Sequence, residues 1–328
     1  MVTIKDIAQE AGVSTMMVSR VINKRYNQVS AENIERIEKI IRKYNYIPNS
    51  AAQSLSSKTS KIIAIFIQGN ANSLVQPYNA IMLGALIQDV QAYGYNTMVH
   101  FISNYSDVHN KLQSWKACGA IFFGMFEKDF EQFPSKTDVP FVFTDCYCSF
   151  IQIANVGIDN YKGGVLAAQH LLDYGHRNFA TIGEYLNESP LIQQRLNGFR
   201  DTLLRAGIEM NPDCIINFDS FAVQKLIERK GEHLAIFSFS DIHSLNIMKQ
   251  LNEHGYQVPE DFSIVGFDNL YLCQLTNPEL TTISQDITKK AQSAVDLLFQ
   301  YLKYPDFPLQ NITLDVQLIS RATVKKIR

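Results

Sequence analysis

A helix-turn-helix is predicted for Thr3–Asn23, which has the sequence TIKDIAQEAGVSTMMVSRVIN. Thr3 and Asp6 have the spacing of a capping box for a first helix, and Gly12 is suited to its left-handed end. Ser14 is the expected N-cap of a second helix. Apolar residues recur at helical spacing in both segments, so each has one face to bury; they are Ile4, Ile7, Ala8 and Ala11, then Val18, Val21 and Ile22. Two short helices joined by a glycine-containing turn are typical of this motif.

The opposite face of the second predicted helix carries polar and flexible side chains. These are Thr15, Met16, Ser19, Arg20 and Asn23. Hydroxyl, amide and guanidinium groups of this kind contact phosphates and base edges in nucleic-acid complexes. The alternative is a small solvated pair of helices that contacts a partner protein.

A third helix and a linker are predicted to follow. Ser30 precedes Ala31–Tyr44, in which isoleucines recur at helical spacing, and Pro48 ends the regular structure. The next segment, Asn49–Ser57, is small and polar except for Leu55. It is too short and too polar to be helical alone, so it predicts a linker or a hinge that becomes helical on binding.

Charge is distributed unevenly along the 328 residues. The net charge is -2, but residues 1–61 carry a balance of +5 and the remainder a balance of -7. A basic head on an acidic body fits a nucleic-acid-binding head joined to a regulatory body.

From Ile62 onward the pattern changes to alternating strands and helices. Glycine follows a helical stretch and precedes a β-rich stretch four times, which predicts a helix C-cap before a buried parallel strand; these glycines are Gly94, Gly175, Gly207 and Gly255. The predicted strands are Ile62–Ile67, Asn96–Ile102, Ala120–Phe123, Phe141–Thr144, Ala180–Ile182, Ala235–Phe239 and Ser263–Gly266. This order predicts a doubly wound α/β architecture, with ligand at the carboxyl ends of the strands. Its length favours two similar lobes with a cleft between them.

Several classes of protein are disfavoured by missing motifs. No phosphate-binding loop is present, and no Gly-x-Gly-x-x-Gly follows the first strand, so a nucleotide or dinucleotide enzyme is disfavoured. The five cysteines and seven histidines have no metal-ligand spacing, and they favour reduced thiols. Neither a signal peptide nor an apolar run of membrane-spanning length is found. We therefore expect no catalytic residue, metal or cofactor, no membrane association, and a cytoplasmic location.

The chain resembles the lactose-repressor/galactose-repressor family of bacterial transcription regulators over essentially its whole length. The head motif described above carries the resemblance, and so does the segment from Asn45 to Leu55, which contains Asn45-Tyr-Ile-Pro-Asn49 and Ala52-Gln-Ser-Leu55. In the body the matching motifs follow in order: Asp159–Gly163, His170–Leu172, Gly175–Arg177, Arg195–Phe199, Val265–Asp268 and Leu280–Gln285.

The resemblance implies an all-α helix-turn-helix domain at residues 1–47, a hinge at 48–60 and an effector-binding and dimerisation domain at 61–328. The last resembles a periplasmic sugar-binding protein with two parallel-sheet lobes. The first lobe is expected at about 61–158 and 285–315, and the second at about 159–284 and 316–328.

The resemblance also implies a homodimer that binds a pseudo-palindromic double-stranded DNA operator. Thr15, Met16 and Arg20 would face the bases, and Arg20 suits a bidentate contact with guanine. Ser14, Ser19 and Asn23 would contact phosphates. In the hinge, Leu55 matches a leucine that wedges into the minor groove, and Asn49, Ala52 and Gln53 would lie beside it. Gln53 stands where many members carry arginine.

An effector site is implied by residue-by-residue matching. Asp145, Arg195 and Asp268 match effector-contacting positions, and Asp241 lies nearby in the pattern. Phe218 matches a stacking aromatic, and Gln68 a cleft-lining position. Carboxylates that accept from hydroxyls and a guanidinium that donates suit a polyol.

Some positions depart from the family pattern. The loop Gln68–Tyr78 replaces a common Asn-Pro-Phe-Phe, Phe123 stands where some sugar-binding members have a polar group, and Lys290 stands where a small residue is common. The identity of the effector therefore does not transfer.

The main hypothesis is a dimeric repressor that is controlled by a sugar or sugar derivative. In a first alternative the same regulator uses a purine, or a phosphocarrier protein as corepressor. A second is a carbohydrate-sensing binding protein without DNA function. A third is a glycosidase that uses Asp145 and Asp268 as its carboxylate pair, although no further catalytic motif supports it.

Overall fold

The computed structural model describes residues 2–46, 60–123, 139–146, 152–186, 188–231 and 233–327. The chain forms two compact units, Met1–Ser60 and Lys61–Arg328, which are described separately below. The predicted hinge residues Asn49, Ala52, Gln53 and Leu55 lie outside the described residues. Across the described ranges, no helix is long and apolar enough to cross a membrane.

The first unit is a helix-turn-helix followed by a third helix. Its elements are α1 (Ile4–Ala11), α2 (Thr15–Ile22), the 3-10 turn η1 (Tyr26–Gln28) and α3 (Ala31–Lys43). Thr3 and Asp6 form the predicted capping box, and Gly12 ends α1 at φ 65° in the left-handed region. Ser14 and Ser30 cap α2 and α3. The three helices bury one apolar cluster around Ile7, Val18, Val21 and Ile37.

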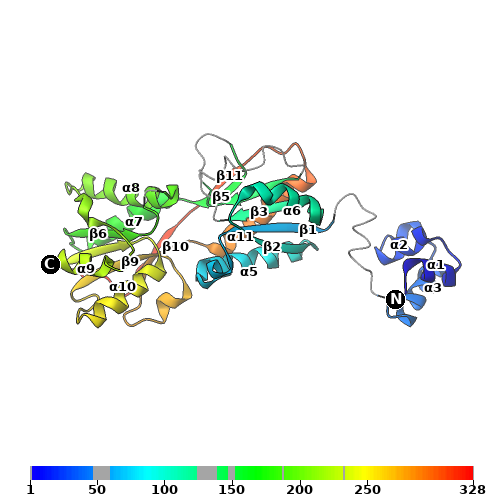
Figure 1. Ribbon diagram of the computed structural model, residues 1–328, viewed down its shortest axis with the longest axis horizontal. Coiled ribbons are helices and arrows are strands. Elements are labelled where there is room, and N and C mark those ends of the chain that lie inside the picture. The colour runs from blue at the N-terminus through cyan, green and yellow to red at the C-terminus, as the bar shows by residue number, and fades with distance from the viewer. Residues whose placement is uncertain are drawn as a thin grey trace. The chain divides into compact units, whose positions relative to one another are not determined.

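The first lobe of the second unit is built on a six-stranded sheet whose order is β11-β5-β4-β3-β1-β2 (Figure 1). All of its strand pairs are parallel. Its strands are β1 (Ile62–Gln68), β2 (Asn96–Ile102), β3 (Gly119–Phe123), β4 (Phe141–Thr144), β5 (Asn155–Ile158) and β11 (Asn311–Leu314). Its helical elements are η2 (Ala71–Val75), α5 (Pro77–Ala92), η3 (Tyr105–Asp107), α6 (Val108–Trp115) and α11 (Ile287–Lys303).

The second lobe is built on another six-stranded sheet, with the order β12-β10-β9-β8-β6-β7. Only β12 is antiparallel to its neighbour among these described strands. The strands are β6 (Phe179–Gly183), β7 (Ile215–Asn217), β8 (Leu234–Ser238), β9 (Phe262–Asp268), β10 (Thr281–Ser284) and β12 (Gln317–Ile319). The helical elements are α7 (Asn160–Asp173), α8 (Pro190–Arg205), η5 (Pro212–Cys214), α9 (Ala222–Glu228), α10 (Asp241–Glu253) and η6 (Tyr271–Gln274).

Both sheets are covered on both faces, as parallel sheets require. In β1, Ile63, Ile65 and Ile67 pack in the cluster that contains α5 and α11, whereas Ala64 and Phe66 face the cluster of α6. In the second lobe, α7 and α8 lie on one side of the sheet and α10 on the other (Figure 1). These apolar layers produce the predicted two-lobed, doubly wound α/β fold, and the fold class is confirmed.

The chain passes between the two sheets three times. It does so between β5 and α7, between β10 and α11, and between β11 and β12. Links of one or two residues make these crossings.

Helices α7 and α8 pack with almost no space between their backbones, because each has a glycine at the contact. A Cβ on Gly164 would lie 2.0 Å from the carbonyl oxygen of Arg195, and a Cβ on Gly198 would lie 2.0 Å from that of Tyr161. The close approach fixes Arg195 against the first turn of α7.

Gly164→Ala is expected to destabilise the second unit by about 1–3 kcal/mol, because overpacking forces backbone shifts. Thermal or denaturant unfolding measures this change. Gly84→Ala is the matched control: Gly84 also lies inside a helix, but a Cβ there meets nothing within 4 Å. The control should be stabilising by about 0.5–1 kcal/mol. Equal effects of the two variants would contradict the close packing.

Candidate DNA-reading face and effector cleft

The exposed face of α2 holds the residues predicted to read DNA. Met16 is 63% exposed, Thr15 is exposed, and Ser19 and Arg20 are half-buried. None of the described residues forms a hydrogen bond or ion pair with the Arg20 guanidinium. Its five donors are therefore available to an external acceptor.

Ser14 and Asn23 hold the two ends of α2. Ser14 Oγ accepts from the Met17 amide at 3.3 Å, and Asn23 Nδ2 donates to the Ser19 carbonyl at 2.8 Å. Both side chains are exposed to solvent, although each forms a hydrogen bond with the backbone of α2. Their predicted contact with phosphates stays a prediction.

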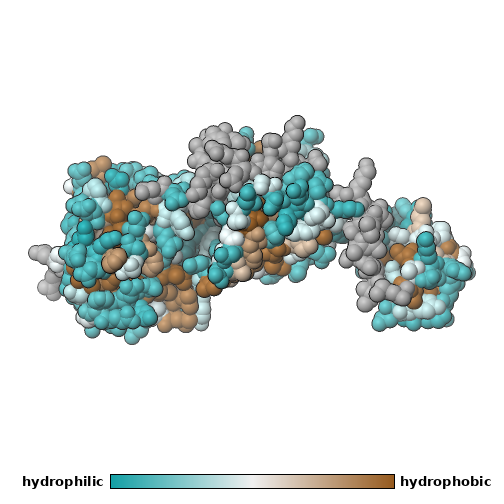
Figure 2. Space-filling view, viewed as in Figure 1, coloured by the Kyte–Doolittle hydropathy of each residue, from teal (hydrophilic) through white to brown (hydrophobic). Residues whose placement is uncertain are grey.

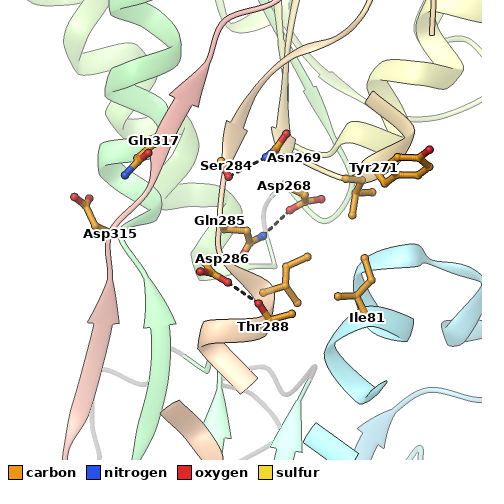
Figure 3. A pocket seen from close by; sticks show the side chains of 12 residues that line it. Ile81, Asp268, Asn269, Tyr271, Ser284, Gln285, Asp286, Thr288, Asp315 and Gln317 are labelled. Carbon is orange, nitrogen blue, oxygen red and sulfur yellow. Dashed lines mark hydrogen bonds between the residues drawn. The ribbon is translucent and has the colours of Figure 1, made fainter. Parts of the chain in front are cut away.

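A cavity of about 430 Å³ lies in the second unit, beside the links between the lobes (Figure 3). Its lining combines α5 of the first lobe, the loop after β9 and the two links β10–α11 and β11–β12; the residues are Ile81, Asp268, Asn269, Leu270, Tyr271, Ser284, Gln285, Asp286, Ile287, Thr288, Asp315 and Gln317. In Figure 2 the visible surface is hollowed where the two lobes meet, and hydrophilic residues border much of the hollow. We call this cavity the effector cleft.

Asp268 is the buried carboxylate of the cleft. Asp268 is the last residue of β9, and its φ of 122° is a backbone conformation that residues other than glycine rarely adopt. Its Oδ1 accepts a hydrogen bond from Gln285 Nε2 at 2.5 Å. Burial and the nearby Asp241 raise the pKa of Asp268 to about 7, against the opposing effect of Arg195. Strained backbone of this kind is retained where the surrounding structure demands it, often at functional sites.

Lys290 lies behind Gln285 and is completely buried. Its Nζ donates to Gln285 Oε1 at 2.7 Å, to Asp145 Oδ2 at 2.6 Å and to the Tyr78 hydroxyl at 3.0 Å. Tyr78 in turn donates to Asp145 Oδ2 at 2.7 Å. Burial lowers the pKa of Lys290, while Asp145 acts to raise it. Burial and Asp145 together raise the pKa of Tyr78.

A chain of hydrogen bonds therefore joins the two lobes. It runs from Asp268 of the second lobe through Gln285 in the link to Lys290, Asp145 and Tyr78 of the first lobe. The structure thus connects two predicted effector residues, Asp145 and Asp268, through groups that the prediction did not include.

Arg195 is held deep in the second lobe. Its Nε donates to Asn160 Oδ1 at 2.8 Å, its Nη1 donates to the Phe239 carbonyl at 2.6 Å, and the guanidinium lies 3.5 Å above the ring of Phe267. It lies near enough to Asp268 to lower the pKa of that carboxyl, although it is not among the residues that line the cleft.

Asp241 stays a predicted effector residue, but both of its oxygens already accept hydrogen bonds within the lobe. Thr282 donates to Oδ1 at 2.6 Å, and the Leu270 amide donates to Oδ2 at 2.8 Å. Burial raises the pKa of Asp241. These contacts fasten the loop that carries Asp268 to the start of α10.

Phe218 and Gln68 do not line the cleft cavity. The Phe218 ring stacks on His243 at a centroid distance of 4.1 Å, and His243 Nε2 lies 3.6 Å from Glu184 Oε1. Gln68 ends β1 and is half-buried. Their effector contacts remain predictions. In the described ranges, no three His, Cys, Asp or Glu side chains are grouped as metal ligands.

Tyr78 and Gln285 are site residues that the sequence analysis missed, and Lys290 was noted only as a departure from the family pattern. A signal for Lys290 was present: it falls on the apolar face of α11 with Ile287, Ala291 and Ala294. A lysine at a core position of an amphipathic helix points to a buried, paired charge.

Comparison with known proteins identifies the family. Residues 3–49 match the family described as bacterial regulatory proteins, lacI family, and residues 168–324 match a periplasmic binding protein-like domain. A transcriptional repressor PurR from Mannheimia succiniciproducens is 30% identical over the full length of both chains. The chain belongs to the lacI family.

Other relatives and solved structures agree with this assignment. A PurR repressor from Vibrio atlanticus is 28% identical over the full length of both chains. A lac repressor dimer bound to operator and the anti-inducer ONPF matches with a TM-score of 0.85 and 26% identity, covering 99% of each chain. A CelR regulator in complex with cellobiose matches with a TM-score of 0.74 and 25% identity, covering 98% of this chain and all of that one. This lacI-family protein is a DNA-binding transcriptional regulator, and these relatives are named as regulators rather than enzymes.

Asp268 gives this lacI-family regulator a specific pH dependence. Its pKa rises from 3.8 to about 7, so the folded state binds the proton more tightly than the unfolded state. The resulting stabilisation is complete below pH 3.8 and is lost as the pH rises through 7. Wild-type protein should therefore lose more thermal stability between pH 5.5 and 8 than Asp268→Asn does.

The control is Gln317→Ala, which changes an exposed, non-titratable residue of the same cleft and should keep the wild-type pH dependence. Identical stability profiles for wild type and Asp268→Asn would contradict the titration of Asp268.

Proposed function

We propose that the protein is a homodimeric repressor that binds a pseudo-palindromic operator and responds to a polyhydroxyl effector, a sugar or sugar derivative. The observation that carries the proposal is the polar cleft at the links between two lobes, in a chain that begins with a helix-turn-helix. The proposed boundaries are a DNA-binding domain at 1–47, a hinge at 48–60 and an effector domain from 61 onward.

In the proposed complex, α2 of each protomer enters the major groove of one half-site. Arg20 reads guanine, Met16 makes an apolar contact such as one with a thymine methyl, and Thr15 faces the bases. Ser14, Ser19 and Asn23 contact phosphates. The proposed hinge contacts are those of Asn49, Ala52, Gln53 and Leu55.

The polyhydroxyl effector is supported by the chemistry of the lining. Carboxylate, amide and hydroxyl groups dominate it, and they suit a ligand with many hydroxyl donors and acceptors. Among similar structures, the CelR regulator is described in complex with cellobiose.

A purine is the second candidate effector, because the similar repressors are named PurR. Against it, Tyr271 is the one aromatic residue that lines the described cleft, and Phe218 stacks on His243 instead. Thermal-shift measurements with matched panels of sugars and purines separate the two, since a ligand that binds the folded state raises the unfolding temperature.

Arg20→Ala should relax operator specificity at one base-pair position, with a loss of about 1–3 kcal/mol in binding free energy. Selection from a random DNA library supplies the operator, and titrations of single-base variants measure the loss. Arg42→Ala removes an exposed arginine of α3 that pairs with Glu38, and should leave discrimination unchanged. Wild-type discrimination at every position in Arg20→Ala would exclude base reading by Arg20.

Asp268→Ala should abolish the effector response while operator binding is retained, because the variant loses the buried acceptor of the cleft but not the DNA-reading face. Operator titration with and without the best ligand of the wild type measures this. Asp306→Ala, which removes an exposed carboxylate, should respond as the wild type does. An unchanged dose response in Asp268→Ala would remove Asp268 from the effector site.

A further inference from the structure

Lys290 brings a positive charge to the back of the effector cleft, yet its hydrogen bonds are all made within the protein. An ammonium group has three N–H donors. Three acceptors surround the Lys290 ammonium within 3.0 Å, namely Gln285 Oε1, Asp145 Oδ2 and the Tyr78 oxygen. No donor is left over for a phosphate or carboxylate of a ligand.

Arg195, another cation near the cleft, uses at least two of its five N–H donors within its own lobe. Arg195 donates to Asn160 and to the Phe239 carbonyl, and it stacks on Phe267. Neither cation belongs to the lining of the cleft. Among the described residues, the lining of the cleft therefore offers an anionic ligand no lysine or arginine donor.

The lining itself is acidic and rich in acceptors. Among the described residues that form it are three carboxylates, Asp268, Asp286 and Asp315, and no lysine or arginine. Asp315 is paired with Lys162, whose Nζ lies 2.6 Å from its Oδ1, whereas Asp268 and Asp286 form no ion pair within the described residues. Behind them, Asp145 accepts two hydrogen bonds at Oδ2, while its Oδ1 is buried and has no partner in the described part of the chain. A buried carboxylate oxygen without a donor is costly, so a donor supplied by a ligand would stabilise it.

We propose that the cleft selects neutral or cationic effectors that donate hydrogen bonds and rejects phosphorylated or carboxylated ones, and that Lys290 sets this selectivity as an internal counter-ion of Asp145. The inference rests on the proposed function for the presence of a small-molecule effector. It goes further because it assigns the charge class of that effector and a role to Lys290.

Removing the ammonium should change the selectivity in a defined direction. In Lys290→Met, the methionine keeps the approximate volume while Asp145 loses its counter-ion. The site then carries one more uncompensated negative charge, so an amino-bearing ligand should gain affinity relative to its neutral analogue. Lys289→Met is the matched control, because Lys289 is the adjacent residue of α11 and is exposed.

The first experiment titrates matched triplets by calorimetry: glucose, glucosamine and glucose 6-phosphate, then the corresponding galactose series. Wild type and Lys289→Met should bind a neutral or amino member at least tenfold more tightly than its phosphate. In Lys290→Met, the affinity ratio of amino to neutral member should rise at least tenfold. A phosphate that binds most tightly, and loses that advantage in Lys290→Met, would overturn the proposal.

A second experiment needs no knowledge of the effector. Lys290→Ala leaves a space beside Asp145, and n-propylammonium should raise its unfolding temperature while leaving wild type and Lys289→Ala unchanged. Inorganic phosphate should not stabilise the wild type through Lys290. Absence of rescue by n-propylammonium in a folded Lys290→Ala variant, or phosphate stabilisation that disappears in that variant, would overturn the counter-ion role.

The two experiments separate the possible failures. Rescue of Lys290→Ala with no binding by any sugar would refute the polyhydroxyl effector of the proposed function and retain Lys290 as an internal counter-ion. Sugar binding without rescue would support the proposed function and refute the role of Lys290.

Discussion

The buried ion pair between Lys290 and Asp145 is the interaction on which the cleft depends. A lysine that is fully removed from water is strongly destabilising unless it is paired and its hydrogen bonds are complete. Here Asp145, Tyr78 and Gln285 complete them. Removing one partner of such a pair typically costs about 3–5 kcal/mol, because an uncompensated charge remains buried.

The same interaction provides a physical route between ligand and conformation. Asp268 belongs to the second lobe, whereas Lys290, Asp145 and Tyr78 belong to the first, and Gln285 in the link joins them. A ligand that donates hydrogen bonds to the Asp268 carboxylate competes there with the amide of Gln285. Different affinity for two lobe arrangements is what an effector needs in order to shift their populations. Since Tyr78 lies in the first turn of α5, a change at Asp268 can reach that helix through a few hydrogen bonds.

Much of the fold was predictable because local signals and tertiary structure agree. The caps Thr3, Ser14 and Ser30 begin the three helices of the first unit, as the sequence predicted. All four glycines predicted to end helices have positive φ. The seven predicted strands also occur. Most are buried parallel strands with continuous apolar runs, whereas β2 lies at the edge of its sheet and is only partly buried.

Five strands of three or four residues were not predicted, and two of them, β5 and β10, lie inside their sheets. β7 and β12 have three residues each, and β11 alternates between half-buried and exposed positions, so none forms an apolar run. The site was predictable only where a carboxylate or arginine matched a family motif. The role of Lys290 was not predicted, because its partners Tyr78, Asp145 and Gln285 are 212, 145 and 5 residues away in the sequence. The fold brings all three next to its ammonium group.

The central claim is that one coupling free energy links effector binding in the cleft to operator binding. The measurement that tests it most directly is a reciprocal titration of the wild type: operator affinity with and without the effector, and effector affinity with and without the operator. The account predicts that both affinities change by the same factor, as linkage requires. An effector that binds in the cleft and leaves operator affinity unchanged would contradict it.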